Sequence, residues 1–272
     1  MLACSRCPNE RPCRIWKVAD LRIVRRVELA ALRAWPALEQ WDDDGWLLRF
    51  AEGYTKRANS VTPLQPCSDA IADRVAQCEA LYRQRGLPPI FRLVAPLVPA
   101  ELDAHLERRG YALVDPTLVL SAPLHALSLP APSFPLHSMD DIDAWLRAHK
   151  AVSGTALQAT HGRILAAIEG RLLLATMQEE GEPVACALAV VENGLVGLFD
   201  LAVAPAWRRQ GLGRALMIGL LHGAHDVGAQ RAYLQVVEGN GPARELYQAL
   251  GMRELYRYWY RVGPFQAPNL TA

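Results

Sequence analysis

The pattern of apolar residues and turn residues occurs twice along the chain in the same order. When the sequence is compared with itself at a shift of 141 positions, Gly53 aligns with Gly194, and residues 46–121 align almost without gaps. Gly110 then aligns with Gly251. Few residues are identical, so the pattern of secondary structure repeats rather than the sequence. A chain of 272 residues is long enough for two such units.

Strand patterns alternate with helix patterns in each half, which is typical of a mixed α/β fold. In the first half, Ser68 or Asp69 is expected to cap a helix with its side-chain oxygen. Four prolines between residues 121 and 137 indicate a linker. For the first half the spacing predicts helices over residues 23–34, 69–85 and 99–109 and strands over residues 46–50, 55–61, 89–94 and 112–120.

The second half follows the same order with additional strands. Glu180-Gly181 and Asn193-Gly194 are typical of tight hairpin turns, and Ser138 is expected to cap a helix. The spacing predicts helices over residues 138–149, 161–169, 213–226 and 242–250 and strands over residues 171–177, 183–191, 195–203, 231–237 and 253–262. We therefore expect two tandem α/β (mixed α+β) domains, residues 14–122 and 138–265, joined by a linker over residues 123–137.

Composition and charge exclude several classes of protein. Lys and Arg total 29 and Asp and Glu total 28, so the net charge of +1 provides no field that would hold a nucleic acid. The longest apolar stretches, near residues 185–191 and 215–221, are far shorter than the roughly 18 residues that span a bilayer. The first residues do not form the apolar run of a signal peptide. We expect a cytoplasmic protein with neither a nucleic-acid nor a membrane partner.

Cys4, Cys7 and Cys13 form a cluster in a segment rich in proline and arginine. Three thiols could contribute to a metal site, but a closed zinc site takes four ligands, and no histidine lies nearby. The alternative is an N-terminal extension without regular structure. We expect no metal.

One segment of the second half has the composition of an anion-binding loop. Arg208–Gly213 reads Arg-Arg-Gln-Gly-Leu-Gly and precedes a predicted helix. Backbone N–H groups at a helix start are unpaired and lie at the positive end of the helix dipole, and glycine lets a phosphate approach them closely. The aligned segment of the first half, Cys67–Ala72, contains an aspartate that would repel phosphate. We expect a pyrophosphate to bind only the second half.

A longer ordered motif in this region resembles the GCN5-related N-acetyltransferases, the GNAT superfamily. The resemblance covers residues 135–262 in full, and residues 14–120 resemble a degenerate second copy, which implies a tandem arrangement. The residues that carry the resemblance are Leu201–Pro205, Arg208–Gly213, Asn240, Ala243, Tyr247, Gly251 and Met252.

The resemblance implies a splayed mixed sheet in each domain, flanked by helices. The strands at residues 195–203 and 231–237 would part to hold acetyl-CoA, whose pantetheine arm would pair with the backbone of β-strand residues 201–203. Asn240 would bind that arm or fix its loop. The cofactor-binding residues that the resemblance implies are Leu201, Ala202, Val203, Arg208, Arg209, Gln210, Gly211, Leu212, Gly213, Arg214, Asn240, Ala243 and Tyr247.

Acetyl transfer to an amine needs a proton acceptor. An amine with a lysine-like pKa near 10.4 is protonated at neutral pH, and removing that proton costs about 4 to 5 kcal/mol. The candidate acceptors are Asp200 and Glu238, acting through a water. His161 is a weaker candidate, because it lies where substrate loops usually lie, and the alternative is a solvated residue at a helix start. Tyr247 is expected to donate a hydrogen bond to the leaving thiolate, with simple packing as the alternative.

The sequence therefore favours an acetyl-CoA-dependent N-acetyltransferase that transfers the acetyl group directly to a primary amine. The alternatives are a non-catalytic acyl-CoA-binding sensor or regulatory module, and an interaction scaffold. The segment Tyr256–Tyr260 could wall a substrate pocket or only pack in the core. The acceptor amine and the choice between monomer and homodimer stay open. An amine-binding surface or a contact between the halves could be formed by Trp41, Trp46, Tyr54, Lys56 and Arg57.

Overall fold

The structure is a computed structural model that describes residues 20–98, 100–132, 137–156 and 158–265. The cysteine cluster at Cys4, Cys7 and Cys13 lies outside the described residues. The first half contains the helices α1 (Leu21–Arg33), α2 (Ile71–Gln84) and α3 (Ala100–Arg108), the short 3-10 helix η1 (Lys56–Ala58), and the strands β1 (Glu39–Asp43), β2 (Trp46–Phe50), β3 (Val61–Pro63), β4 (Ile90–Val94) and β5 (Ala112–Pro123).

The second half contains more elements in a related order. Its helices are α4 (Ile142–Ser153), α5 (Ala159–Ala166), α6 (Leu212–Asp226) and α7 (Gly241–Ala249), with the 3-10 helices η2 (Leu124–Ala126) and η3 (Pro205–Trp207). Its strands are β6 (His137–Met139), β7 (Arg171–Glu179), β8 (Glu182–Glu192), β9 (Leu195–Val203), β10 (Arg231–Val237) and β11 (Arg253–Val262).

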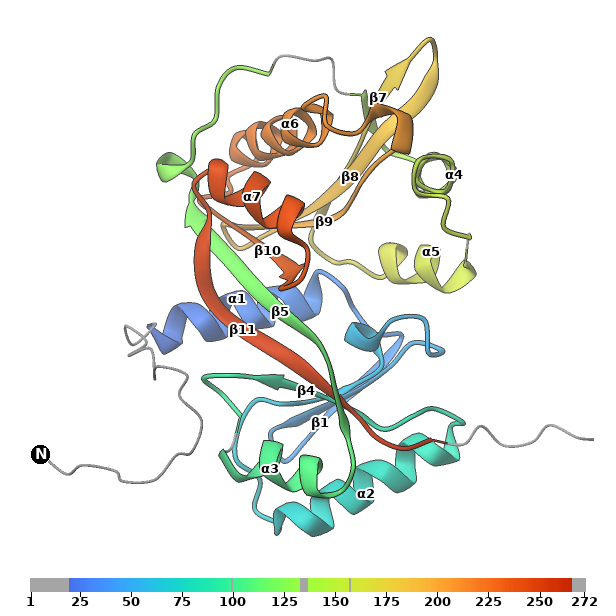
Figure 1. Ribbon diagram of the computed structural model, residues 1–272, viewed down its shortest axis with the longest axis vertical. Coiled ribbons are helices and arrows are strands. Elements are labelled where there is room, and N and C mark those ends of the chain that lie inside the picture. The colour runs from blue at the N-terminus through green and yellow to red at the C-terminus, as the bar shows by residue number, and fades with distance from the viewer. Residues whose placement is uncertain (1–19, 99, 133–136, 157, 266–272) are drawn as a thin grey trace, which may run out of the picture.

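All eleven described strands belong to one sheet, in the order β1-β2-β3-β4-β11-β5-β10-β9-β8-β7-β6 (Figure 1). The pairs β3–β4 and β9–β10 are parallel, and the other described pairs are antiparallel. A mixed α/β fold is therefore confirmed. The expectation of a separate sheet in each half is corrected, because a single sheet runs through both halves.

The last strand of each half lies in the other half's part of the sheet. The strand β5 closes the first half but pairs with β10, where Leu120 lies opposite Leu234. The strand β11 closes the second half but pairs with β4, where Trp259 lies opposite Leu93. The two exchanged strands also pair with each other and run side by side across the middle of the molecule (Figure 1). The two halves are thus interlocked.

Helices cover both faces of the second half because its strands are apolar on both faces. Along β8, Ala185, Ala187 and Ala189 pack in the core cluster that contains α6. The intervening Leu188 and Val190 pack in the cluster that contains α1 and α4. This alternation is the two-residue period of a strand. The helix α1 of the first half therefore covers strands of the second, while α2 and α3 cover the first half's own core.

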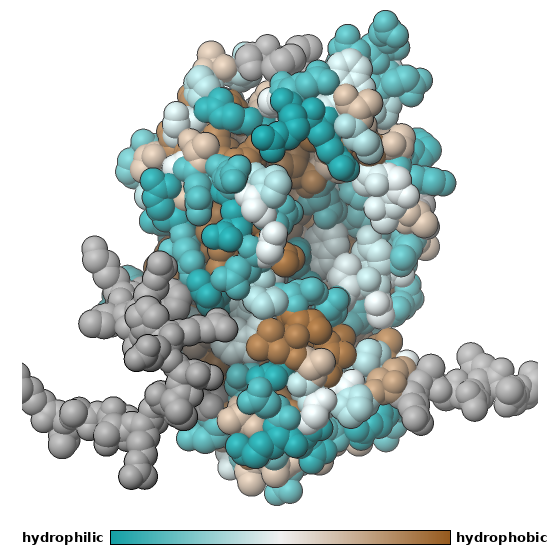
Figure 2. All heavy atoms as spheres, in the orientation of Figure 1, coloured by the Kyte–Doolittle hydropathy of each residue, from teal (hydrophilic) through white to brown (hydrophobic). Residues whose placement is uncertain are grey.

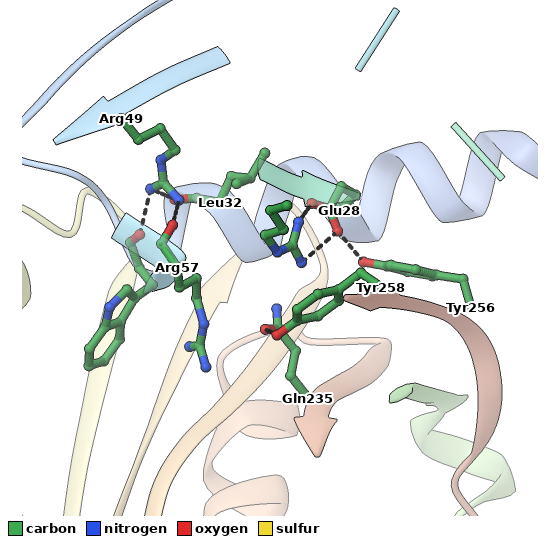
Figure 3. A network of polar contacts seen from close by, with 9 residues as sticks. Glu28, Leu32, Arg49, Arg57, Gln235, Tyr256 and Tyr258 are labelled. Atoms are coloured by element: carbon green, nitrogen blue, oxygen red, sulfur yellow. Dashed lines mark hydrogen bonds and ion pairs between the residues drawn. The ribbon is translucent and has the colours of Figure 1, made fainter. Parts of the chain in front are cut away.

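Buried polar contacts also join the halves. Glu28 on α1 and Arg92 on β4 form an ion pair with side chains 0% and 1% exposed. Tyr256 on β11 donates a hydrogen bond of 2.5 Å to Oε2 of Glu28, and the Arg92 guanidinium lies 3.8 Å from the ring centre of Tyr258. Figure 3 shows this cluster beside Arg49, whose side chain extends from β2 toward the end of α1.

Two local predictions for the first half are wrong. The segment predicted as a strand over residues 55–61 forms η1 and then β3, and β1 was not predicted because all five of its residues are exposed. Ala70, not Ser68 or Asp69, occupies the N-cap of α2, without a side-chain cap. Ser68 instead donates its N–H and its hydroxyl to Oδ2 of Asp44.

A third correction concerns the helix predicted to begin at Ser138. The strand β5 continues to Pro123, and Ser138 lies in β6 rather than at a helix start. Asp141 caps α4 instead, by accepting from the N–H groups of Asp143 and Ala144. Both hairpin turns are confirmed, since Glu180, Asn193 and the glycines after them have positive φ angles.

The face of the molecule in Figure 2 is mainly hydrophilic, with a compact apolar patch at the level of β4. Among the described helices, none is long and apolar enough to cross a membrane.

Candidate active site

The parallel strands β9 and β10 part halfway along their length. Their pairing runs from Leu195 opposite Arg231 to Leu198 opposite Leu234, and it stops there. Beyond this point β9 pairs with β8, and β10 pairs with β5. A cavity of about 240 Å³, which we call the splay cavity, lies where the strands diverge. Among the described strands, one backbone edge of β9 is therefore left without a partner.

A bulge in β9 turns Asp200 out of the regular ladder. The register shifts between the β8 residues Cys186 and Leu188, so two residues of β9 lie opposite one of β8. Asp200 has a φ of 50°, in the left-handed region that a side chain rarely adopts. As a result its carboxylate lines the splay cavity and also a second, larger cavity described below.

The loop after β9 presents unpaired amides at the start of α6. The first backbone hydrogen bond of this helix runs from the N–H of Ala215 to the carbonyl of Gly211. Among the described residues, no backbone acceptor serves the N–H groups of Leu212, Gly213 or Arg214. Gly211 has a φ of 85°, which requires glycine. Such a helix start binds anions through its amides and its dipole.

The arginines of this loop differ in their contacts. Arg208 donates from Nε to the carbonyl of Val203, and Gln210 donates from its side chain to Ala206. Arg209 has a positive φ of 64°. These contacts hold residues 203–210 in a tight turn directly before the start of α6.

The structure places the other candidate residues in three groups. The splay cavity is lined by Asp200, Leu201, Asn240, Ala243 and Tyr247. Ala202 and Val203 lie further along the unpaired edge of β9. Glu238 lines neither cavity, and its Oε1 lies 3.4 Å from Nη1 of Arg257.

Asn240 and Tyr247 belong to α7. Asn240 is the N-cap, and its Oδ1 accepts from the N–H of Ala243 at 3.2 Å. Tyr247 is buried except for its contact with the splay cavity, and its hydroxyl has no hydrogen-bond partner among the described residues. Burial raises the pKa of Tyr247 to about 12. The phenol is therefore neutral at physiological pH and can donate a hydrogen bond.

A second cavity of about 550 Å³, which we call the aromatic cavity, lies at the junction of the two halves. The first half contributes Trp35, Tyr54 and Arg57 to its lining, and the second half contributes His149, His161, Asp200 and Tyr258. Its size lies within the range of small-molecule sites. Since Asp200 and Arg57 line both cavities, these two residues mark where the cavities meet.

His161 on α5 is an almost fully enclosed polar group of this cavity. It is only 4% exposed, and its Nε2 lies 3.0 Å from Oδ2 of Asp200. The contact is not a hydrogen bond, and neither atom has a hydrogen-bond partner in the described chain. Ring centres of Trp35 and Tyr54 lie 5.4 Å from the imidazole. The expectation of a solvated His161 is therefore wrong.

The surroundings change the acidity of two neighbouring side chains. Burial lowers the pKa of His149, and the adjacent His161 adds to this effect while Asp200 opposes it. Burial raises the pKa of Tyr54, and Asp200 contributes in the same direction. Both side chains are thereby held neutral around physiological pH.

Sequence reasoning missed one buried donor in the splay cavity. Gln235 on β10 accepts a hydrogen bond of 2.8 Å from the Tyr258 hydroxyl, and its buried Nε2 has no partner among the described residues. No spacing rule connects Gln235 with a residue 23 positions later. The signal that could have pointed to Gln235 is its polar side chain in the middle of an otherwise apolar stretch of β10.

These features fit acetyl-CoA. The free amides at α6 suit a pyrophosphate, the unpaired edge of β9 suits an extended arm, and the splay cavity can receive an acetyl group. No group of three or more His, Cys, Asp or Glu side chains is arranged to hold a metal within residues 20–265, apart from the segments not described.

Together, the fold and the cleft define an N-acetyltransferase of the GNAT class. The model of the family described as "Probable histone acetyltransferase Rv0428c C-terminal" matches residues 22–261. The chain belongs to this family.

Similar proteins agree with this assignment. The chain is 26% identical over 245 residues to the uncharacterized N-acetyltransferase YobR of Bacillus subtilis, covering 88% of this chain and 98% of that protein. It is 37% identical over 91 residues to the probable histone acetyltransferase Rv0428c of Mycobacterium tuberculosis, covering 34% of this chain and 30% of that protein. A GCN5-related N-acetyltransferase from Kribbella flavida has a similar fold, with a TM-score of 0.68 at 19% identity over 92% of this chain and 96% of that one.

Proposed function

We propose that the protein transfers the acetyl group of acetyl-CoA directly to a primary amine, with the cofactor in the splay cavity and the amine in the aromatic cavity. The observation that carries this proposal is the position of Asp200, which lines both cavities. A carboxylate at that junction can reach an amine on one side and an acyl group on the other.

Acetyl-CoA would supply a thioester, whose carbonyl carbon an amine can attack. The residues that would hold it are those at the start of α6 and along the free edge of β9: Leu201, Ala202, Val203, Arg208, Arg209, Gln210, Gly211, Leu212, Gly213, Arg214, Asn240, Ala243 and Tyr247. The amides of residues 212–214 have no backbone acceptor in the described chain, which supports binding of the pyrophosphate there.

Asp200, with His161 beside it, would accept the proton that the amine loses as its nitrogen bonds to the acetyl carbon. Tyr247 would donate a hydrogen bond to the sulfur as the carbon–sulfur bond breaks, and the free thiol leaves after taking up one proton. Glu238 is the second candidate for proton acceptor. Its ion pair with Arg257 and its absence from both cavity linings favour Asp200.

We also propose that the chain consists of two tandem GNAT-like units, residues 14–122 and 138–265, and that only the second binds acetyl-CoA. The order β4–α3–β5 matches the order β10–α7–β11, which supports the repeat. At the position aligned with Asp200, the first unit has Asn59. Its side-chain oxygen accepts from the N–H groups of Ala51 and Gly53, and its Nδ2 donates to the carbonyls of Ala51 and Thr55. This buried amide stabilises the local backbone, whereas Asp200 at the aligned position is the proposed proton acceptor.

The test is a thiol-release assay with acetyl-CoA and a panel of primary amines. We expect amine-dependent release of coenzyme A, and a loss of most of it in Asp200→Asn without a loss of acetyl-CoA binding by calorimetry. A protein that binds acetyl-CoA but releases no thiol with any amine would instead be an acyl-CoA sensor.

A further inference from the structure

The guanidinium of Arg57 is a cation without an anionic partner in the described part of the chain. Arg57 lies in η1, and its Cζ lies 5.4 Å from the ring centre of Trp35 and 5.5 Å from that of Phe199. Its Nε is buried and has no hydrogen-bond partner among the described residues, and no carboxylate there forms an ion pair with it. A partly buried charge of this kind is costly unless a ligand compensates it.

Neither neighbouring acid forms an ion pair with Arg57. Asp115 forms an ion pair of 3.0 Å with Lys56, and Asp200 lies 3.0 Å from His161. Within the described lining of the aromatic cavity, the guanidinium of Arg57 and the carboxylate of Asp200 are therefore opposite charges that form no ion pair with each other.

The backbone of Arg57 is held in place by another arginine. Arg49 is fully buried, and it donates to the carbonyl of Arg57 at 2.7 Å and to the carbonyls of Leu32 and Trp35. Figure 3 shows the Arg57 side chain leaving this contact and extending toward the side of Gln235. Gln235 lines the splay cavity with Arg57, so the guanidinium is held at the junction of the two cavities.

We propose that the amine acceptor carries a free carboxylate close to its amino group, as α-amino acids do, and that Arg57 binds this carboxylate. The inference rests on the proposed function, since it assigns the acceptor of the same site. Phe199, which lies beneath the guanidinium, directly precedes Asp200 in β9, so one compact zwitterion can reach both side chains. A planar guanidinium suits a carboxylate through two parallel hydrogen bonds.

The rest of the cavity suits an amino-acid side chain. Trp35, Tyr54 and Tyr258 form aromatic walls around it. The amino group would lie near Asp200, the carboxylate near Arg57, and the side chain against these rings. A protein N-terminus or a lysine within a polypeptide lacks a carboxylate at this position and would leave Arg57 unpaired.

The test compares acceptors that differ only in the carboxylate: phenylalanine with phenethylamine, histidine with histamine, and lysine with cadaverine. Thiol release is measured with wild type, Arg57→Gln and Arg57→Lys. We expect the wild type to prefer at least one amino acid over its amine by more than about tenfold in kcat/KM. In Arg57→Gln that preference should disappear through a rise in KM of roughly 30-fold for the amino acid, with little change for the amine.

Arg85→Gln is the matched control, because Arg85 also stacks on two aromatic rings of the first half, those of Trp41 and Phe50, outside both cavities. It should keep the preference, and Arg57→Lys should keep part of it. Amines that react as well as their amino acids in the wild type would overturn the inference, and so would an equal loss of kcat for both acceptors in Arg57→Gln. If the proposed function itself is wrong, no acceptor of either kind will cause release of thiol from acetyl-CoA.

Discussion

The imidazole Nε2 of His161 lies 3.0 Å from Oδ2 of Asp200, and this contact connects the helix α5 with the bulge of β9. One partner is buried among aromatic rings, and the other lines both cavities. The proton-acceptor role that we propose for Asp200 rests on this position.

Asp200→Asn and His161→Gln should lower kcat while the dissociation constant of acetyl-CoA stays the same. The loss for Asp200→Asn should be about 100-fold or more, the usual contribution of a general base. His161→Gln should lose less, because the carboxylate remains. Steady-state kinetics and calorimetry give both quantities. If Glu238→Gln shows the large loss and Asp200→Asn does not, Glu238 is the acceptor.

Tyr247→Phe should lower kcat about 10- to 100-fold and leave the fold intact, because only the unpaired hydroxyl is removed. Burial raises the pKa of Tyr247 to about 12, so the phenol stays protonated across the range in which the enzyme can be assayed. The wild-type pH profile should therefore contain no ionisation between pH 7 and about 10 that disappears in Tyr247→Phe. Detection of such an ionisation would contradict the assigned role.

Gly213→Asp should weaken coenzyme A binding by more than about tenfold, because a carboxylate would lie at the amides proposed for the pyrophosphate. The thermal midpoint of unfolding of this variant should stay the same or rise, since an acidic residue in the first turn stabilises a helix. A Cβ at Gly213 meets Val203 at an ordinary 3.5 Å, so the change causes no clash. Ala72→Asp places the same charge at the aligned, exposed position of α2 and should leave affinity unchanged. Equal loss in both variants would refute a site restricted to the second half.

Arg92→Leu should lower the free energy of unfolding by about 3 to 5 kcal/mol, because it leaves the fully buried Glu28 carboxylate without its cation. The paired change Glu28→Met with Arg92→Met should recover most of this loss. Urea unfolding followed by circular dichroism measures both. A cost below about 1 kcal/mol for Arg92→Leu would show that Tyr256 alone satisfies the carboxylate.

Stability should fall in mild acid partly because of His149. Its pKa is lowered in the folded protein, chiefly by burial, so the unfolded chain binds this proton more readily. The contribution is fully present above about pH 6.5, the ordinary pKa of histidine, and is lost as the pH falls toward the lower folded value. His149→Gln should flatten the decline of the thermal midpoint between pH 7.5 and 5.5. An unchanged slope would point to other groups.

Sequence patterns predicted the elements that are rich in apolar and aromatic residues along their length. The strands β2, β10 and β11 have the predicted bounds for this reason. The strand β1 could not be predicted, since an exposed edge strand leaves no apolar period. Pattern also says nothing about which strands pair, so the exchange of β5 and β11 was not foreseen.

In the candidate site, too, some features could be predicted from the sequence and others could not. The loop at Arg208–Gly213 could be predicted because its glycines and arginines are adjacent in sequence. The contact between His161 and Asp200 could not, since the two residues meet only when α5 folds over the bulge of β9. Tyr54, Arg57 and Tyr258 were recognised as candidates for a substrate surface, and the structure gathers all three around one cavity.

The exchanged strands also set the order in which the chain can fold. As the polypeptide leaves the ribosome, β4 is made early, but its neighbour β11 is the last described strand to emerge. The nascent first half therefore holds an open sheet edge throughout synthesis of the second, and such edges invite pairing with other chains. Chaperone binding during that interval, or slow release of the growing chain, would decide how much of the protein reaches its native state.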